Sequence, residues 1–247
     1  MSRALIVTGA ASGIGAATAR RLAAPGVSLL LATRSNAAGL ASVASACRER
    51  GAAVETRLAD LADPDAGSAL VAAAAAAFGR LDGLVANAGF ADRTPWEALD
   101  DAAYAASAEA MGGGFFRLCR AAIPVLAEGG RIVAVSSFVA HVFRAHVPAF
   151  PASAAAKASV EAMVRSLAHA LGAKGVTVNA VAPGVIRKDG AAKRALPPER
   201  LAALAAEIPL GRIGEPEEVA AAIAFLLSAE AGYITGQVIH VSGGLVI

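Results

Sequence analysis

The chain has 247 residues, of which 56% are hydrophobic and only 4% aromatic, and its 22 basic and 20 acidic residues give a net charge of +2. This length and hydrophobic content suit one large α/β domain, and the abundance of alanine favours closely packed helices on a sheet over an all-β sandwich. The near balance of charge, without a basic block, argues against a nucleic-acid-binding protein.

Strand-like and helix-like patterns alternate along the whole chain. Strands are predicted over residues 4–8, 27–33, 53–58, 84–86, 131–135, 176–181 and 237–241. Helices are predicted over residues 14–24, 37–50, 64–78, 101–126, 152–171 and 215–227. Because the strands are continuous apolar runs, we expect a parallel sheet buried under helices on both faces, in a single domain of residues 1–247.

The helix predicted over residues 101–126 contains three successive glycines, 112–114. Each costs roughly 1 kcal/mol relative to alanine inside a helix. The triplet therefore indicates close packing or a local irregularity.

Cysteine usage and the apolar runs indicate a reducing compartment. Cys47 and Cys119 have neither metal-ligand spacing nor the context of a disulfide-rich domain. The alanine run near residues 71–78 is far too short to span a membrane. We expect a cytoplasmic protein with no signal peptide, membrane segment or metal site.

A glycine-rich loop follows the first predicted strand. Gly9, Gly13 and Gly15 have the spacing Gly-x-x-x-Gly-x-Gly, with Ser12 and Ile14 between them, and a predicted helix begins within the loop. Small residues let the backbone approach a pyrophosphate, and a helix N-terminus offers N–H groups and the positive end of its dipole. The loop predicts a dinucleotide site, although glycines also serve ordinary tight turns.

The residues after the second predicted strand bear on the choice of cofactor. An acidic residue there would bind the ribose 2′-hydroxyl and repel a 2′-phosphate, but this chain has Arg34 and Ser35. Arginine can pair bidentately with a phosphate. We therefore expect NADP(H) in preference to NAD(H); the alternative is that Arg34 is a solvated loop residue.

The order of the motifs resembles that of the short-chain dehydrogenase/reductase family. The resemblance covers residues 4–244 and rests on the loop 8–15, Asn87-Ala88-Gly89, Ser136-Ser137, Lys157, Asn179 and Pro183-Gly184. It implies a Rossmann-type, doubly wound parallel sheet of about seven strands, a nicotinamide dinucleotide, a small-molecule substrate and a homo-oligomer, either tetramer or dimer.

The resemblance also implies which residues contact the cofactor. They lie in loops at the strand ends and at the start of one helix, and they are Gly9, Ser12, Gly13, Ile14, Gly15, Arg34, Ser35, Asp60, Leu61, Asn87, Ala88, Gly89, Lys157, Pro183, Gly184 and Ile186. Asp60 has an alternative reading as a turn residue or helix cap, and Asn87 as a turn residue.

The family's four catalytic residues are only partly present. In the family a tyrosine delivers a proton to the substrate oxygen, a lysine one turn later lowers its pKa, a serine binds the oxygen, and an asparagine supports a water relay. Ser137, or alternatively Ser136, fits the serine, and Lys157 fits the lysine. Ser153 stands at the tyrosine position and shares a helix face with Lys157, and Met111 stands at the asparagine position.

The missing acid has no evident replacement in the sequence. Tyr104 and Tyr233 belong to other parts of the predicted fold, and Phe150 stands near the tyrosine's usual distance from the serine. His141 and His146 are either proton donors near neutral pH or ordinary loop histidines.

The stretch 188–198 is expected to be a mobile lid over the substrate. Lys188 stands where the family has a threonine. Arg187, Lys188, Lys193 and Arg194 are either solvated charges or contacts for an anionic substrate.

Three functions fit these features. The first is an NADP(H)-dependent oxidoreductase for a carbonyl, alcohol or enone, with a proton supplied by water held by Lys157 and a serine, by a histidine, or by the substrate. The second is a cofactor-binding protein without redox activity, acting as a sensor or an inactive partner subunit. The third is a redox-neutral enzyme, such as a cyclase or isomerase. Analogy with the family favours the first.

Overall fold

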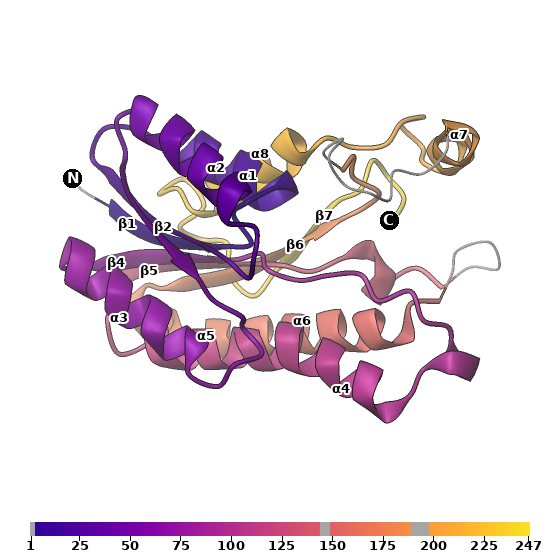
Figure 1. The fold of residues 1–247 in the computed structure, drawn as a ribbon, viewed down its shortest axis with the longest axis horizontal. Helices are drawn as coiled ribbons and strands as arrows, with labels where there is room; N and C mark the ends of the chain where they lie inside the picture. Colours follow the sequence, from indigo (N-terminus) through magenta and orange to yellow (C-terminus); the bar gives the residue numbers. More distant parts are fainter. Residues whose placement is uncertain (1–2, 144–148, 189–197) are drawn as a thin grey trace.

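The computed structural model describes residues 3–143, 149–188 and 198–247. It confirms the predicted parallel sheet, whose strand order is β3-β2-β1-β4-β5-β6-β7 with every neighbouring pair parallel (Figure 1). The strands are β1 (Arg3–Thr8), β2 (Val27–Thr33), β3 (Ala53–Leu58), β4 (Leu81–Ala86), β5 (Leu126–Val135), β6 (Thr177–Pro183) and β7 (Val238–Val241).

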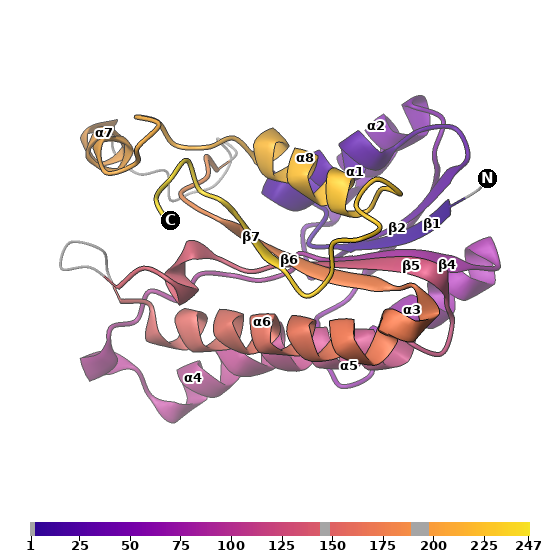
Figure 2. The ribbon, with the colours of Figure 1, turned by 180° about the vertical axis from the view of Figure 1, so that it is seen from behind.

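Helices cover both faces of this sheet, as Figures 1 and 2 show from opposite sides. One face carries α1 (Gly13–Leu22), α2 (Ala37–Glu49) and α8 (Pro216–Leu226). The other carries α3 (Ala66–Phe78), α4 (Asp101–Ala108), α5 (Gly114–Ala122) and α6 (Pro151–Leu171). A further helix, α7 (Pro198–Ala206), stands away from the sheet on the side of the C-terminus, and the sequence analysis did not predict it.

Alternating side chains of the strands form the core on both sides of the sheet. Leu5 and Val7 of β1 pack in the cluster that includes Ile223 of α8, whereas Ile6 packs in the cluster that includes Leu118 of α5. This alternation is the normal geometry of a strand, and burial of each such side chain contributes about 1.5–3 kcal/mol. The continuous apolar runs of the sequence are explained by these two buried faces.

The helix predicted over residues 101–126 contains the local irregularity that its glycines indicated, but its predicted end is wrong. Between α4 and α5 the chain forms a π-helical segment, Glu109–Gly113, and α5 ends at Ala122, two residues before Pro124. Residues 126–130 belong to β5 instead. Close packing accounts for the glycines, since a Cβ built on Gly112 would lie 2.7 Å from the Oγ of Ser159.

The chain reverses its direction of travel across the sheet at β1, which lies between β2 and β4. Ligands of open α/β sheets bind beyond the carboxyl ends of the strands at such a switch point. Within the described part of the chain, no helix has the length and apolar character that crossing a bilayer requires.

Candidate cofactor site and active site

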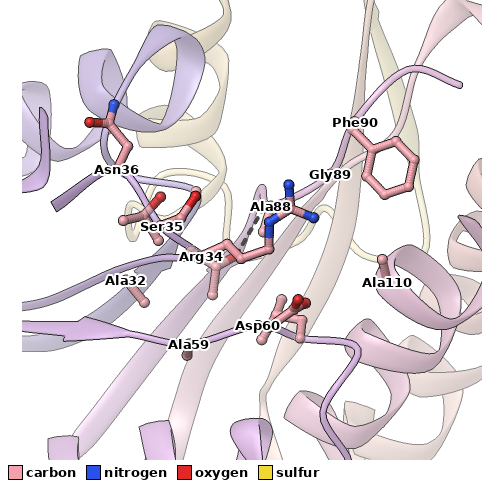
Figure 3. Close-up of a pocket in the computed structure, with 14 residues that line it drawn as sticks. Ala32, Arg34, Ser35, Asn36, Ala59, Asp60, Ala88, Gly89, Phe90 and Ala110 are labelled. Atoms are coloured by element: carbon pink, nitrogen blue, oxygen red, sulfur yellow. Dashed lines mark hydrogen bonds between the residues drawn. The ribbon is translucent and has the colours of Figure 1, made fainter. Parts of the chain in front are cut away.

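A cavity of about 220 Å³ opens at the carboxyl ends of the central strands, at the β1–β4 switch point. Figure 3 shows its labelled wall, with Arg34 and Ser35 following β2 and Asp60 following β3. The predicted cofactor residues that line it are Gly9, Arg34, Ser35, Asp60, Leu61, Ala88 and Gly89. Thr8, Asn36 and Phe90 also line the cavity, although they were not among the residues expected to contact the cofactor.

Hydrogen bonds between the ends of β1 and β4 fix the glycine loop. Thr8 Oγ1 accepts from the backbone N–H groups of Asn87 at 3.0 Å and Ala88 at 3.1 Å. The side-chain amide of Asn87 donates to the carbonyl oxygens of Thr8 at 3.0 Å and Gly9 at 3.2 Å. A Cβ built on Gly15 would lie 2.1 Å from the Gly9 oxygen, so a larger residue cannot replace Gly15 without moving the loop.

The start of α1 fits a bound diphosphate. The side chain of Ser12, the N-cap residue, makes no capping hydrogen bond. Gly13 has a positive φ of 52°, and a Cβ built on it would meet no atom within 4 Å. A helix N-terminus beside open space is a favourable place for an anion, so the residues present fit a dinucleotide. The partly buried Ile14 packs against the core.

Arg34 is exposed and extends into the cavity from the end of β2 (Figure 3). Its guanidinium is therefore available to an anionic group of a ligand. Asp60 faces the same cavity, but one of its carboxylate oxygens also accepts from the Ala62 N–H at 3.1 Å, a turn-stabilising contact.

Lys157 is buried beside the cavity. Its Nζ donates to the Val135 carbonyl oxygen at 2.7 Å, and a Cβ built on Gly89 would lie 3.1 Å from that Nζ. Burial lowers the pKa of Lys157 to about 8, and the Glu161 carboxylate partly offsets this effect. Lys157 and Met111 line a second, much smaller cavity of about 10 Å³.

Ser153 and Lys157 lie on the buried face of α6, but their polar atoms have different partners. Ser153 Oγ accepts from the Asp92 N–H at 2.8 Å and lies 3.4 Å from the Asp92 carbonyl oxygen. The side chain is only 3% exposed. The hydroxyl therefore holds the loop that follows β4 in place.

The two serines after β5 face different surroundings. Ser137 is half-buried and begins the 3₁₀ turn Phe138–Ala140, where its Oγ accepts from the Val139 N–H at 3.4 Å. Ser136 is buried, and its hydroxyl donates to the carboxylate of Glu161. Ser137 is therefore the more accessible of the two hydroxyls.

The predicted cofactor residues after β6 lie beside β7. Gly184 donates its N–H to the Val241 oxygen at 3.0 Å, and a Cβ built on it would lie 2.8 Å from the Cα of Ser242. Pro183 ends β6, and Ile186 forms an isolated bridge with Gly214. These residues do not line either of the two cavities.

The alternative proton donors and the charged stretch are only partly described. Arg187 pairs with Glu215 at 2.7 Å in an exposed ion pair, and Lys188 is exposed. Tyr104 and Tyr233 are exposed, and Phe150 stands at the N-cap of α6. His146, Lys193 and Arg194 lie outside the described residues.

Glu161 is a buried acidic residue that the sequence analysis missed. It is 4% exposed, and His141 Nε2 lies 2.8 Å from its carboxylate. Its one sequence signal is a carboxylate four residues after Lys157, on the same helix face. Among the described residues, no group of three or more His, Cys, Asp or Glu side chains is arranged to hold a metal ion.

Comparisons with known proteins show which family the chain resembles over nearly its whole length. The family model described as "Enoyl-(Acyl carrier protein) reductase" matches residues 9–246. The chain is 42% identical over 245 residues to the cis-4-hydroxycyclohexanecarboxylate dehydrogenase of Sinomonas cyclohexanicum, covering 98% of this chain and 96% of the relative. It is 35% identical over 243 residues to the 3-oxoacyl-[acyl-carrier-protein] reductase of Escherichia coli, covering 97% and 96%.

Solved structures with a bound cofactor are also similar. A short-chain dehydrogenase from Burkholderia cenocepacia in complex with NADP has a TM-score of 0.90 and 32% identity, covering 99% of this chain and 97% of that one. A blue fluorescent protein from a metagenomic library in complex with NADPH has a TM-score of 0.92 and 32% identity, covering 99% and 98%.

Proposed function

Because the chain belongs to the short-chain dehydrogenase/reductase family, we propose that it transfers a hydride between NADP(H) and a small secondary alcohol or carbonyl compound. The observation that carries the proposal is the link between the two parts of the site. Gly89 lines the cavity that contains Arg34, and the same glycine lies against the ammonium of Lys157. A dinucleotide in the cavity would therefore bring its reactive end towards Lys157.

The residues would divide the work of binding the cofactor. The loop from Gly9 to Gly15 would hold the diphosphate, Arg34 the 2′-phosphate, and Lys157 the ribose next to the nicotinamide. When bound, the nicotinamide supplies or accepts the hydride. The NADP- and NADPH-bound relatives support the preference for the phosphorylated cofactor.

Lys157 is the proton donor that this proposal favours, acting through one water molecule. Ser153 is a poor candidate because it is engaged by Asp92, and an alkyl hydroxyl is a weak acid. A buried ammonium whose pKa is about 8 can exchange a proton near neutral pH. Ser137, half-buried at the end of β5, would donate a hydrogen bond to the substrate oxygen.

The relatives suggest where to look for the substrate. The relative with 42% identity is named for a cyclic hydroxy acid, and several relatives with 35% identity are named for 3-oxoacyl carrier-protein substrates. Both names describe a compound that carries an alcohol or ketone and also an acyl or carboxylate group. We propose that this chain acts on a substrate of the same general class.

The test is to follow the absorbance of the reduced cofactor with the full chain. NADPH is mixed with 4-oxocyclohexanecarboxylate, a 3-oxoacyl thioester and an enone, and NADP⁺ with cis-4-hydroxycyclohexanecarboxylate. We expect turnover of at least one compound, and a loss of about 10²–10⁴-fold in kcat for K157M. The control K174M alters an exposed lysine and should keep full activity.

A second function is favoured by one observation. Met111 and the Asp92-bound Ser153 fill the two positions where the family has polar catalytic groups. A cofactor-binding protein without redox activity would bind NADPH tightly, show no turnover with the panel, and gain none on S153Y. A product formed with no change in the cofactor would instead indicate a redox-neutral enzyme.

We further propose that the chain forms a homo-oligomer. β7 is an edge strand of the sheet, and Ile239 on it and Phe116 on α5 are exposed. Uncovered strand edges and apolar side chains favour association. Light scattering during gel filtration should give a multiple of the 24.4 kDa monomer, and a monomer at micromolar concentration would contradict the proposal.

A further inference from the structure

A polar cluster with a buried centre lies next to the proposed active site but outside its cavities: Glu161 and Ser136 are buried, His141 is half-buried and His240 is exposed. At its centre is Glu161 of α6, which accepts hydrogen bonds from the Ser136 hydroxyl and from His141, whose Nε2 is 2.8 Å away. An ionised carboxylate can only accept, so the His141 nitrogen is the donor. The His141 ring meets the His240 ring of β7 edge-on, with 4.5 Å between the ring centroids.

These hydrogen bonds join the two elements that carry the proposed catalytic groups. Ser136 directly precedes Ser137, and His141 ends the 3₁₀ turn that Ser137 begins. Lys157 precedes Glu161 by one turn of α6. A single carboxylate therefore ties the end of β5 and the following turn to the helix that bears the lysine.

The cluster also places a carboxylate one helical turn from Lys157 on the buried face of α6. On one side the lysine shares an apolar cavity wall with Met111, Phe115 and Val160, and its hydrogen-bond acceptor is the neutral carbonyl of Val135. Burying an ammonium is costly unless an opposite charge compensates it. Glu161 lies at the i+4 position on the same helix face, and its carboxylate raises the pKa of Lys157 against the effect of burial.

We propose that Glu161 is a positioning residue for the proposed reaction: it fixes Ser137 relative to Lys157 through Ser136 and His141, and it compensates the charge of the buried lysine. The expected effect of Glu161 on turnover rests on the proposed function. The compensation of the Lys157 charge does not. The titratable groups that face Glu161 are Lys157 on its own helix, His141 after β5 and His240 on β7.

E161Q is the informative variant, because glutamine keeps an acceptor oxygen for Ser136 and His141 and removes the charge. The chain has four lysines, so the Lys157 signal of lysine labelled with ¹³C at Cε can be assigned by comparison with K157M. We expect E161Q to lower the NMR titration midpoint of Lys157 by about one pH unit or more. S136A removes one hydrogen bond and keeps the charge, and should leave the midpoint within a few tenths of a unit.

Turnover supplies the second measurement. In reduction, the alkaline limb of the kcat–pH profile should move to lower pH in E161Q, whereas S136A should lower kcat several-fold without moving the limb. An unchanged Lys157 midpoint in folded E161Q overturns the proposal. Absence of turnover in the wild-type protein would overturn the proposed function alone, since the NMR titration needs no substrate.

A thermal comparison covers the case in which E161Q does not fold. If the charge of Glu161 compensates that of Lys157, K157M should restore the folding of E161Q, or raise its Tm by several degrees where the single variant folds. A double variant K157M/E161Q that is no more stable than E161Q overturns the proposal.

Discussion

Lys157 links the chemistry of the site to the stability of the fold. Its pKa is about 8 in the folded chain and 10.5 when unperturbed, with burial as the main cause. Between these pH values the unfolded chain holds the proton and the folded chain has released it. The free energy of unfolding therefore rises with pH across this window, as far as this group is concerned.

K157M isolates this contribution. Relative to K157M, the wild-type protein should gain roughly 2–3 kcal/mol of unfolding free energy between pH 8 and pH 10.5, and nothing below pH 7. Urea unfolding of both proteins at several pH values measures the difference, and changes in other groups cancel. A difference that is constant with pH would mean that Lys157 titrates normally.

Ser153 is predicted to matter for stability more than for chemistry. S153A removes the acceptor of the Asp92 N–H and should lower the unfolding free energy by about 1–3 kcal/mol while changing kcat by less than about threefold. S166A, which alters an exposed serine on the same helix, is the matched control. Loss of activity in a well-folded S153A would instead place the hydroxyl in the reaction.

Arg34 tests the choice between the two cofactors. Losing a charge-assisted contact of about 1.5–3 kcal/mol should raise the KM for NADPH by roughly 10–100-fold in R34A and leave the KM for NADH nearly unchanged. R57A is the control: it removes another exposed arginine, which pairs with Glu55 on β3 and does not line the cavity. Equal losses for both cofactors would contradict a role in binding the 2′-phosphate.

At the scale of elements, the break between α4 and α5 depends on close packing. A Cβ on Gly114 would lie 2.8 Å from the Cβ of Leu61 and 3.1 Å from its carbonyl oxygen, so G114A should destabilise the fold by about 1–3 kcal/mol. At Gly172 a Cβ would meet nothing within 4 Å and φ is −56°, so G172A should be neutral or stabilising. Thermal melts of the two variants compare the sites, and equal melting temperatures would contradict the packing argument.

The sequence predicted best those elements that are buried to the same extent along their whole length. The central strands β1, β2, β4 and β6 were recognisable because both faces are buried, which leaves a continuous apolar run. The glycine triplet indicated close packing or an irregularity between α4 and α5, but apolar spacing could not identify the irregularity as a π-helical segment, since it cannot show where one extra residue enters a turn. β5 was predicted too short because its first residues, Leu126 to Gly130, are partly polar or glycine.

The candidate site likewise contains some residues that the sequence predicted and some contacts that it could not predict. Gly9 and Arg34 lie in short motifs next to strand ends, and both line the cavity, as the sequence motifs led us to expect. The contacts of Ser153 with Asp92 and of Glu161 with His141 join residues 61 and 20 positions apart. Such pairs exist only once the tertiary structure has brought their elements together.

For the whole molecule, the position of the cavity predicts how a cofactor changes stability. The cavity lies where the half of the sheet formed by β1, β2 and β3 meets the half that begins at β4, and it is lined by residues that follow strands of both halves. A ligand bound there contacts both halves in the folded state alone. Its binding free energy therefore adds to the free energy of unfolding of the entire domain.

NADPH at about 100 times its Kd should add about 2.7 kcal/mol to the free energy of unfolding and raise Tm by roughly 5–10 °C. Calorimetry over a range of NADPH concentrations measures this shift. NADH at the same concentration should give a smaller shift, because it lacks the 2′-phosphate that we propose Arg34 binds, and R34A should bring the two shifts together. A Tm that is independent of NADPH concentration would rule out the cofactor site whatever the substrate, because this measurement does not depend on turnover.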